Sequence, residues 1–480
     1  MYYRLKPPYA FRGWKKLPFA VQAQYGPQKH VLPIFMEKAP FLDLLSCSGE
    51  EDVDLNAFSE KGRQTLEKLT ADGIIEQSRS PLPPLESWQH YHVFPSRYLS
   101  SILWSITGRC NFRCRHCLVS APDARHLQLP LSDCLRIVEE FAECGIRHVD
   151  ISGGEPLLRS DFEEIVKALT SHEIDIGVIF TNASLLTEST LEMLERNRQF
   201  PAFQLSFDGF GCHDWLRGVD GAEEEADKAF RLLGRSGFPV LASMCIHRGN
   251  RDSLRDTVNH LAGLGVQSLR VSAPQNLGSW QQYSREYALT PGELWTVFRE
   301  YIGRYFEDGM PLDIELGGFF QCKKGKTDYS IRYEHSSDAA VDWSRCPYCQ
   351  TMQHQAYISP EGRLIPCMGF ADTALGERFP DILGQHLGVL TLDSFYRDIT
   401  ETKIADYIAA NPECASCEHL AGCRGGCMVE DISTDGDFLV PDRTCCYFHK
   451  YIGEDAVRAA ADRAIEKFRS PSCPDAASAE

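Results

Sequence analysis

The ten residues Gly-Arg-Cys-Asn-Phe-Arg-Cys-Arg-His-Cys, 108 to 117, contain three closely spaced cysteines, Cys110, Cys114 and Cys117. These are disulfide partners, zinc ligands, or ligands of a group that needs three thiolates and no fourth. A structural zinc site normally requires four protein ligands, and His116 would have to fold back across its neighbour to supply the fourth. A 4Fe-4S cluster held by three cysteines instead leaves one iron open to a substrate or cofactor.

Length and composition indicate a soluble protein with several domains. The chain has 480 residues, 43% of them apolar, which suits about three domains with sizeable cores. The sequence shows neither a signal peptide nor a run of about 18 apolar residues. The net charge of -18 argues against a broad nucleic-acid surface, which would need basic side chains. We therefore expect a cytoplasmic protein without nucleic-acid or membrane partners, whose clustered cysteines suggest metal.

The N-terminal 80 residues are predicted to form a small domain. Residues 19–25 and 30–34 have the pattern of a β-hairpin, and residues 39–47 and 60–75 have the pattern of helices. This combination is winged-helix-like. A proline-rich linker is expected over residues 81–99, because prolines make semi-rigid spacers.

Residues 100–310 are predicted to alternate short strands with amphipathic helices. The strands are expected at 102–106, 148–151, 177–180, 203–207, 240–245 and 269–272, and the helices at 133–143, 162–169, 191–197, 223–233 and 253–264. A capping box, Ser160-x-x-Glu163, is expected to begin the second helix. Such alternation indicates an α/β fold with a parallel sheet, and six units are too few for a closed eight-stranded barrel. An open, partial (β/α)6 barrel or a doubly wound sheet is expected.

Polar or small residues follow each predicted strand. In parallel α/β folds these positions meet on one rim of the sheet, where the chemistry is usually found. The residues after the six strands are, in order, the three-cysteine loop, Gly153 to Pro156, Thr181 with Asn182, Ser206 with Asp208, His247, and Ser272 with Gln275. Loops are polar in general, so only the cysteine loop makes this set informative.

The cysteine spacing x3 and x2 after the first strand of a βα domain resembles the signature of the radical S-adenosylmethionine (radical SAM) family. Phe112 stands where that family often has an aromatic residue. Gly-Gly-Glu-Pro, 153 to 156, is similar to the family's GGEP motif, whose backbone and glutamate would hold the methionine amine. The resemblance implies S-adenosylmethionine as cofactor, with Cys110, Cys114 and Cys117 as cluster ligands and catalytic residues. The implied cofactor contacts are Gly153, Gly154, Glu155, Pro156, Asn182, Ser206, Asp208 and Arg217.

A second group of cysteines lies between residues 346 and 450, after an irregular bridging region at 311–345. Its spacing resembles the SPASM extension of radical SAM enzymes, which carries two auxiliary 4Fe-4S clusters. The resemblance assigns Cys349, Cys367 and Cys427 to the nearer cluster and Cys414, Cys417 and Cys423 to the farther one. The fourth ligand of the nearer cluster is either Cys346 or Cys322, and the fourth ligand of the farther cluster is either Cys445 or Cys446. A pair of zinc knuckles is the alternative. Residues 451–480 are expected to form a helix, at 455–468, and a disordered tail.

The combination resembles maturases of ribosomally made peptides, and it implies a peptide-modifying oxidoreductase with three 4Fe-4S clusters. A flavodoxin or ferredoxin-type donor would supply the electron. The leading hypothesis is thioether formation between a cysteine sulfur and a carbon, as in sactipeptide and ranthipeptide synthases. Carbon-carbon crosslinking and epimerisation are alternatives. Sulfatase maturation is disfavoured because similar enzymes have an aspartate where this chain has Met368. A non-enzyme alternative is an iron-sulfur redox sensor that binds DNA.

The N-terminal domain resembles the precursor-recognition domain (RRE) of such maturases. A small sheet with an exposed edge can add an extended leader peptide as a further strand. Lys15, Lys16 and Lys29 are expected to attract an acidic leader. A DNA-binding winged helix or an inert packing cap are the alternatives. The precursor, the bonded carbon and the oligomeric state do not follow from the sequence.

Overall fold

The computed structural model describes residues 1–23, 32–118, 127–331, 342–432 and 435–469. Its main body is built around a mostly parallel sheet, so the α/β expectation is confirmed. All six predicted strands are present, and each is the parallel neighbour of the next. They are β7 (Ser101–Ser105), β8 (His148–Ser152), β9 (Asp175–Thr181), β10 (Ala202–Ser206), β11 (Val240–Cys245) and β12 (Ser268–Ser272).

The sheet extends beyond these six strands at both ends. β13 (Asp313–Leu316) pairs in parallel with β12, and β16 (Gln355–Ile358) pairs in parallel with β7. Short antiparallel strands complete the edges of this sheet: β14 (Phe320–Cys322) and β15 (Tyr329–Ser330) beside β13, and β17 (Leu364–Ile365) beside β16. The expected bridging region and the cysteine-rich region therefore both contribute strands to the central sheet.

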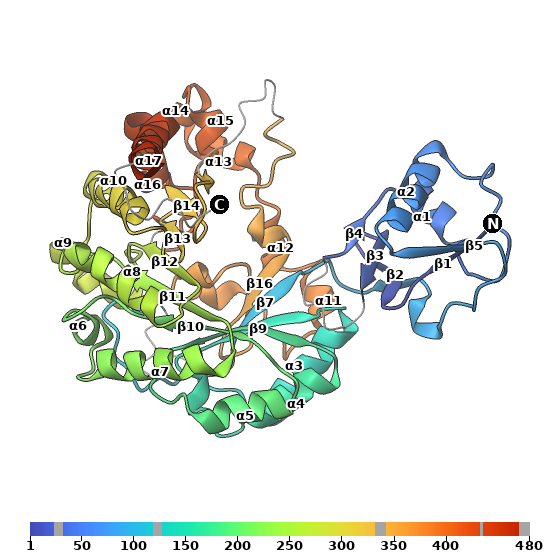
Figure 1. Cartoon of the computed structure of the whole chain (residues 1–480), viewed down its shortest axis with the longest axis horizontal. Coiled ribbons are helices and arrows are strands. Elements are labelled where there is room, and N and C mark those ends of the chain that lie inside the picture. Colours follow the sequence, from blue (N-terminus) through green and yellow to red (C-terminus); the bar gives the residue numbers. More distant parts are fainter. Residues whose placement is uncertain (24–31, 119–126, 332–341, 433–434, 470–480) are drawn as a thin grey trace.

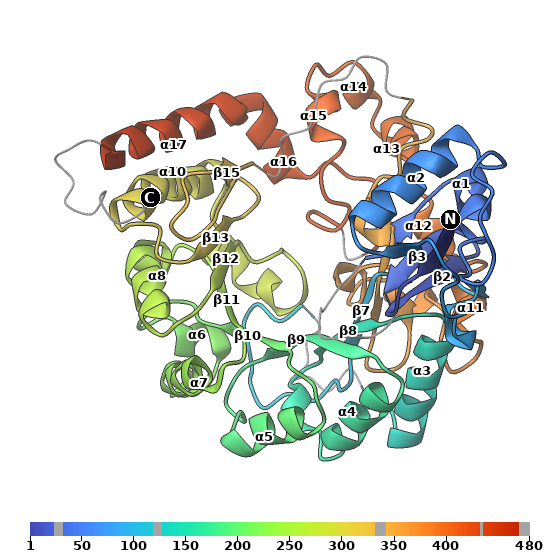
Figure 2. The ribbon, with the colours of Figure 1, turned by 45° about the vertical axis from the view of Figure 1, so that its right-hand side comes forward.

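Amphipathic helices cover the convex face of this sheet. The helices between the strands are α3 (Leu131–Glu143), α4 (Phe162–Ser171), α5 (Glu188–Arg196), α6 (His213–Arg217), α7 (Ala222–Ser236), α8 (Leu254–Gly263), α9 (Ser284–Tyr287) and α10 (Pro291–Glu307). Figure 2 shows β7 to β13 following an arc, with α3, α4, α5, α7 and α8 outside it. Their apolar sides and alternate residues of the strands form one continuous core.

The predicted capping box at the start of α4 is wrong. The helix begins at Phe162, so its N-cap is Asp161 rather than Ser160, and the Asp161 side chain makes no capping hydrogen bond. The carboxylate of Asp161 instead accepts two hydrogen bonds from Arg159, at 2.7 and 3.0 Å. Glu163 pairs with Lys167 and Arg196. A bidentate arginine is a stronger partner for a carboxylate than a neutral backbone N–H.

The described part of the N-terminal domain contains two small sheets and two α-helices. β1 (Tyr2–Leu5) pairs with β5 (Ile75–Ser78), and a second sheet has the order β4-β3-β2-β6. Its strands are β2 (Tyr9–Trp14), β3 (Ala20–Ala23), β4 (Ile34–Phe35) and β6 (His92–Phe94), and the helices are α1 (Lys38–Leu44) and α2 (Glu60–Ala71). The expected hairpin is present as the antiparallel pair β3 and β4; its turn lies outside the described residues.

Two segments near the end of this domain differ from expectation. Helix α2 stops before Gly73, whose φ of +73° suits glycine and ends a helix, so Ile75 begins a strand instead of ending the helix. Part of the expected linker forms β6, which pairs in parallel with β2. Buried Gln89 fastens the same segment, because its amide donates to the carbonyl oxygens of Leu5 and Tyr9.

The remaining helices lie in the C-terminal third of the chain. They are α11 (Leu387–Leu390), α12 (Phe395–Thr400), α13 (Ile404–Ala410), α14 (Pro412–Ala415), α15 (Leu420–Cys423), α16 (Arg443–Tyr447) and α17 (Gly453–Arg469). The predicted C-terminal helix is confirmed as α17, which packs against α10. The expected tail after residue 469 lies outside the described residues. In Figure 1 the N-terminal domain projects from the side of the main body that carries α11, α12 and β16. Among the described helices none is long and apolar enough to cross a membrane.

Candidate functional site

The three-cysteine loop leaves the C-terminal end of β7 and is held from two sides by backbone hydrogen bonds. On one side, the N–H groups of Gly154 and Glu155 donate to the carbonyl oxygens of Thr107 and Arg109, each at 2.8 Å. On the other side, the loop donates to the end of α6: Arg113 N–H to the Arg217 carbonyl at 3.1 Å, and Arg115 N–H to the Leu216 carbonyl at 2.8 Å. The loop is therefore fixed between the end of β8 and helix α6.

Close backbone approach explains the two glycines after β8. A Cβ atom on Gly154 would lie 2.3 Å from the Arg109 carbonyl oxygen, and one on Gly153 would lie 2.6 Å from that of Thr107. Any larger residue would push the cysteine loop away from the sheet. The absence of side chains at Gly153 and Gly154 thus allows the cysteine loop to lie close to the sheet.

The three sulfur atoms influence one another electrostatically. Burial, with smaller contributions from Cys114 and Cys117, raises the pKa of Cys110 to about 12. Burial is also the largest cause of the raised pKa of Cys114, with Cys117 again adding to it. Three thiols in this setting resist losing their protons together unless a positively charged group binds them. The donor set thus fits an iron-sulfur cluster.

This fit concerns a cluster and not a single ion. Among the described residues, no three His, Cys, Asp or Glu side chains gather in a way that would hold one metal ion. A 4Fe-4S cluster takes each cysteine on a different iron, so its ligands need not converge on one point.

A buried ion pair lies beside Cys114. The Nε of Arg217 donates to Oδ2 of Asp208 at 2.8 Å, and the Nδ1 of His213 lies 3.1 Å from the same oxygen. Burial alone would raise the pKa of Asp208, but Arg217 and His213 outweigh it and hold that pKa well below its ordinary value. The Nη1 of Arg217 is 3.9 Å from the sulfur of Cys114. The other Asp208 oxygen accepts the N–H of Cys245 at 2.9 Å.

The carboxylate of Glu155 is fully buried and turned into the protein. It accepts hydrogen bonds from the Thr181 hydroxyl at 2.8 Å, the Asn182 N–H at 2.7 Å and the Leu157 N–H at 3.0 Å. Burial raises its pKa to about 7 in spite of these donors. The side-chain amide of Asn182 lies 3.9 Å from the Cys110 sulfur and donates to Asn111 at 2.8 Å. Glu155 therefore acts on the cysteine loop through the end of β9.

The rest of the rim connects the sheet to the cysteine-rich region. Ser206 ends β10, beside Ser243 of β11. The amide of Gln275, which follows β12, donates to the carboxylate of Glu430 at 3.2 Å. His247 is buried, and its Nε2 has no hydrogen-bond partner among the described residues. The contact between Gln275 and Glu430 thus joins the rim of the sheet to the segment that follows Cys427.

Three cysteines of the second group influence one another. Burial is the largest cause of the raised pKa of Cys367 and of Cys427; Cys349 adds to the first and Cys367 to the second. The Cys427 side chain is nevertheless exposed. This is expected for a side chain that faces an open space while protein atoms surround it on its other sides. Cys322 is engaged elsewhere, because its sulfur donates to the carbonyl oxygens of Lys326 at 3.2 Å and Asp328 at 3.6 Å.

A cavity of about 330 Å³ brings four other cysteines together. Cys414, Cys417, Cys423 and Cys446 all line it. Cys445 is buried, and contact with Cys423 is the first cause of its strongly raised pKa. Negative charge on Cys446 contributes most to the raised pKa of Lys450, which also lines the cavity.

Asp442 connects the two cysteine groups of this region. One carboxylate oxygen accepts the N–H of Cys445 at 2.8 Å, and the other accepts the N–H of Cys427 at 3.0 Å. The side chain is buried and caps the N-terminus of α16. Asp442 was not among the residues predicted from the sequence, although an aspartate three residues before a cysteine at a helix start is an N-cap signal. His213 was missed as well; it precedes Arg217 by four residues and so shares its helix face.

Comparisons with known proteins agree with this geometry. Residues 104–261 match the family model of the radical SAM superfamily. The PqqA peptide cyclase of Granulibacter bethesdensis is 26% identical over 372 residues, which cover 75% of this chain and 91% of that one. The mycofactocin maturase MftC of Mycolicibacterium smegmatis is 27% identical and covers 72% of this chain and 82% of that one.

Solved structures share the fold over most of the chain. Streptococcus suis SuiB bound to its precursor peptide SuiA superimposes with a TM-score of 0.62 at 16% identity, covering 92% of this chain and 99% of that one. Native anSMEcpe with bound AdoMet and a peptide gives a TM-score of 0.56 at 15% identity, over 77% of this chain and 98% of that one. At these identities the likeness concerns the fold.

Proposed function

We propose that this chain, which carries a radical SAM domain over residues 104–261, is an enzyme that modifies a ribosomally made precursor peptide. The observation that carries the proposal is the three-cysteine loop, with sulfurs that influence one another, at the C-terminal end of β7. The names of the relatives support a peptide substrate, since they are a peptide cyclase and a maturase. The family implies S-adenosylmethionine and one 4Fe-4S cluster as cofactors.

Cys110, Cys114 and Cys117 would hold that cluster, and the neighbouring residues would support them. When bound, the cluster and S-adenosylmethionine together supply a 5'-deoxyadenosyl radical that removes a hydrogen atom from carbon. Arg217 offsets negative charge on Cys114 from 3.9 Å, and the amide of Asn182 faces Cys110. Gly153, Gly154 and Pro156, with the end of β10 at Ser206, would contact the cofactor. Glu155 and Asp208 would support the residues around the cofactor without contacting it, because their carboxylates form hydrogen bonds within the protein.

Two auxiliary 4Fe-4S clusters are proposed for the second cysteine group. Cys346, Cys349, Cys367 and Cys427 would hold the nearer one; the engagement of Cys322 with two carbonyl oxygens favours Cys346. Cys414, Cys417, Cys423 and Cys446 would hold the farther one, because these four line one cavity. Iron analysis of Cys446→Ala against Cys445→Ala tests this choice. Loss of about four iron atoms per chain only in Cys445→Ala would reverse it.

The N-terminal domain is proposed to hold the leader part of the peptide. The sheet order β4-β3-β2-β6 makes β4 an edge strand among the described residues; Phe35 of this strand and Leu32 just before it are exposed. An edge strand with exposed apolar side chains suits strand addition by an extended peptide. The expectation that Lys16 attracts the leader needs correction, because its ammonium is paired with Glu401. Lys29 lies outside the described residues.

The finer proposal for the reaction is thioether formation. A hydrogen atom leaves a substrate carbon, a cysteine thiol of the peptide loses its proton, and a carbon-sulfur bond forms. One electron is then left over, and an auxiliary cluster would accept it. Carbon-carbon crosslinking is the second candidate, since a relative is named a peptide cyclase and a ring can close through carbon as well as through sulfur.

Product analysis separates these alternatives. Anaerobically reconstituted, reduced protein with S-adenosylmethionine should form 5'-deoxyadenosine, whereas a DNA-binding redox sensor would form none. A precursor that loses two hydrogen atoms and one alkylatable thiol per turnover would support the thioether. Loss of two hydrogen atoms with all thiols still alkylatable would reject it in favour of a carbon-carbon bond. Flavodoxin or ferredoxin should replace the chemical reductant.

A further inference from the structure

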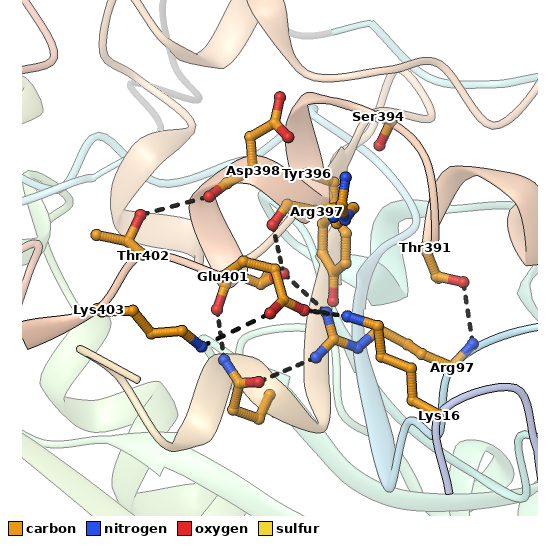
Figure 3. A network of polar contacts seen from close by, with 12 residues as sticks. Lys16, Arg97, Thr391, Ser394, Tyr396, Arg397, Asp398, Glu401, Thr402 and Lys403 are labelled. Carbon is orange, nitrogen blue, oxygen red and sulfur yellow. Dashed lines mark hydrogen bonds and ion pairs between the residues drawn. The ribbon is translucent and has the colours of Figure 1, made fainter. Parts of the chain in front are cut away.

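One carboxylate joins three separate parts of the chain. Figure 3 shows Glu401, directly after α12, surrounded by Lys16, Arg97 and Lys403. Lys16 lies in the turn between β2 and β3 of the N-terminal domain and forms an ion pair with Glu401. Arg97, four residues before β7, lies 3.8 Å from the same carboxylate, and Lys403 lies 3.6 Å from it. Burial raises the pKa of Glu401, but these cations outweigh it and lower that pKa.

Arg97 binds the segment before β7 to the cysteine-rich region. Its side chain is buried, and its guanidinium donates to the Thr400 hydroxyl at 2.8 Å and to the Gln353 side chain at 3.1 Å. Its backbone N–H donates to the Thr391 hydroxyl at 3.3 Å. Gln353 in turn donates to the carbonyl oxygen of Thr400. A buried guanidinium needs a nearby negative charge, and Glu401 is the carboxylate that supplies it.

The segment that carries Glu401 also pairs with a loop that holds candidate cluster ligands. Tyr348 N–H donates to the Thr402 carbonyl at 2.8 Å, and Ile404 N–H donates to the Cys346 carbonyl at 3.0 Å. Pro347 and Lys403 form a β-bridge between these two hydrogen bonds. Residues 401–404 therefore support the loop that runs from Cys346 to Cys349.

Apolar packing already holds the N-terminal domain against the main body. Trp14 packs against Tyr98, in the segment before β7, and its indole N–H donates to the carbonyl of Cys144, directly after α3, at 3.1 Å. The Lys16 and Glu401 side chains are 41% and 30% exposed, so their ion pair by itself contributes little to overall stability. The ion pair instead affects orientation. Because it is a second contact beside the apolar packing of Trp14, it fixes the angle between the N-terminal domain and the main body.

We propose that Glu401 is a positioning residue that fixes the N-terminal domain at a set orientation to the Cys346–Cys349 loop. A peptide held on the N-terminal domain would then reach the reaction centre along a constant path. The inference rests on the proposed function in one respect, namely that the N-terminal domain binds a peptide. The contact itself is testable without any peptide.

The first experiment is amide hydrogen exchange on the full chain without peptide. Lys16→Met, Glu401→Gln and the double variant should each speed exchange at Lys15 N–H, which donates to the Ser96 carbonyl. The expected factor is about two- to fivefold, as for a partly exposed ion pair. The double variant should match Glu401→Gln, because the two side chains act through one contact. Unchanged exchange in both single variants, or additive effects, would overturn the proposal.

Lys61→Met is the matched control for this experiment. Lys61 forms an ion pair with Glu37 at 2.6 Å, entirely inside the N-terminal domain. This variant removes an exposed pair of the same kind without touching the domain contact, so exchange at Lys15 should stay as in the parent protein. Faster exchange in Lys61→Met would show a general loosening of the domain and would also reject the proposal.

The second experiment uses the precursor peptide. Glu401→Gln should lower kcat for the peptide by a similar factor, while leader affinity and peptide-independent formation of 5'-deoxyadenosine stay unchanged. Weaker leader binding in Lys16→Met with normal kcat would mean that Lys16 recognises the leader, and would overturn the positioning role. If no peptide is turned over by the parent protein, the proposed function fails, and the exchange result still decides the contact.

Discussion

The two cysteine groups of this molecule are built in opposite ways. The first comes from one loop of eight residues, fixed by backbone hydrogen bonds to the end of β8 and to α6. The second comes from segments spread over about a hundred residues, and one buried carboxylate, Asp442, ties two of those segments together. In the compact loop, the spacing of the cysteines along the chain already defines the site. The dispersed site forms only where a side chain such as that of Asp442 holds its segments together.

The largest effect is expected from Cys114→Ala in the compact loop. The variant should form no 5'-deoxyadenosine, because the cluster would lose a ligand that the loop cannot replace. Iron analysis should show a loss of about four of about twelve atoms per chain, with the rest retained. Cys212→Ser is the control, since a hydroxyl can keep the hydrogen bond that Cys212 donates to the Gly249 carbonyl. Full iron content in Cys114→Ala would contradict the assignment.

Arg217→Met tests the support behind the same loop. The variant leaves the buried Asp208 carboxylate with only His213 and the Cys245 N–H as partners, and breaking such an ion pair costs about 3 kcal/mol. Urea denaturation should report this loss in the free energy of unfolding. The double variant Asp208→Asn with Arg217→Met should recover part of it, because no buried charge remains unpaired. A single variant as stable as the parent would refute the buried pair.

Gly154→Ala tests the close approach of the sheet to the loop. The new Cβ would lie 2.3 Å from the Arg109 carbonyl oxygen, and relieving such crowding costs about 2 kcal/mol. Stability should fall by that amount, and 5'-deoxyadenosine formation should fall with it. Gly263→Ala is the matched control, because nothing lies within 4 Å of its Cβ position. Equal stability of the two variants would show that the loop shifts freely.

The smallest effect on stability is expected from Asp442→Asn in the dispersed group. The new amide retains one acceptor but presents a donor to the other backbone N–H, which costs about 1–2 kcal/mol. Iron should be lost from both auxiliary clusters while 5'-deoxyadenosine formation without peptide persists. Asp435→Asn, an exposed aspartate nearby, should change neither. Loss from a single auxiliary cluster would show that Asp442 serves one loop alone.

The sequence predicted the six strands β7 to β12 and most of their helices, because apolar periodicity records which face of each element is buried. It missed the flanking strands β13 and β16. β16 contains only four residues, and its partner β7 lies about 250 positions earlier, so no local pattern marks the pairing. The start of α4 at Phe162 was predicted, but its capping box was not found, since the Arg159 side chain engages Asp161.

The sequence by itself determined the candidate ligands, because the spacing of Cys110, Cys114 and Cys117 sets the reach of one loop. Only the tertiary structure decided what those residues face: Arg217 beside Cys114, the inward carboxylate of Glu155, and Lys16 paired with Glu401 instead of standing free. The reason is physical. Spacing along a chain fixes distances within a loop, whereas the partners of a charged side chain come from distant segments that meet only after folding.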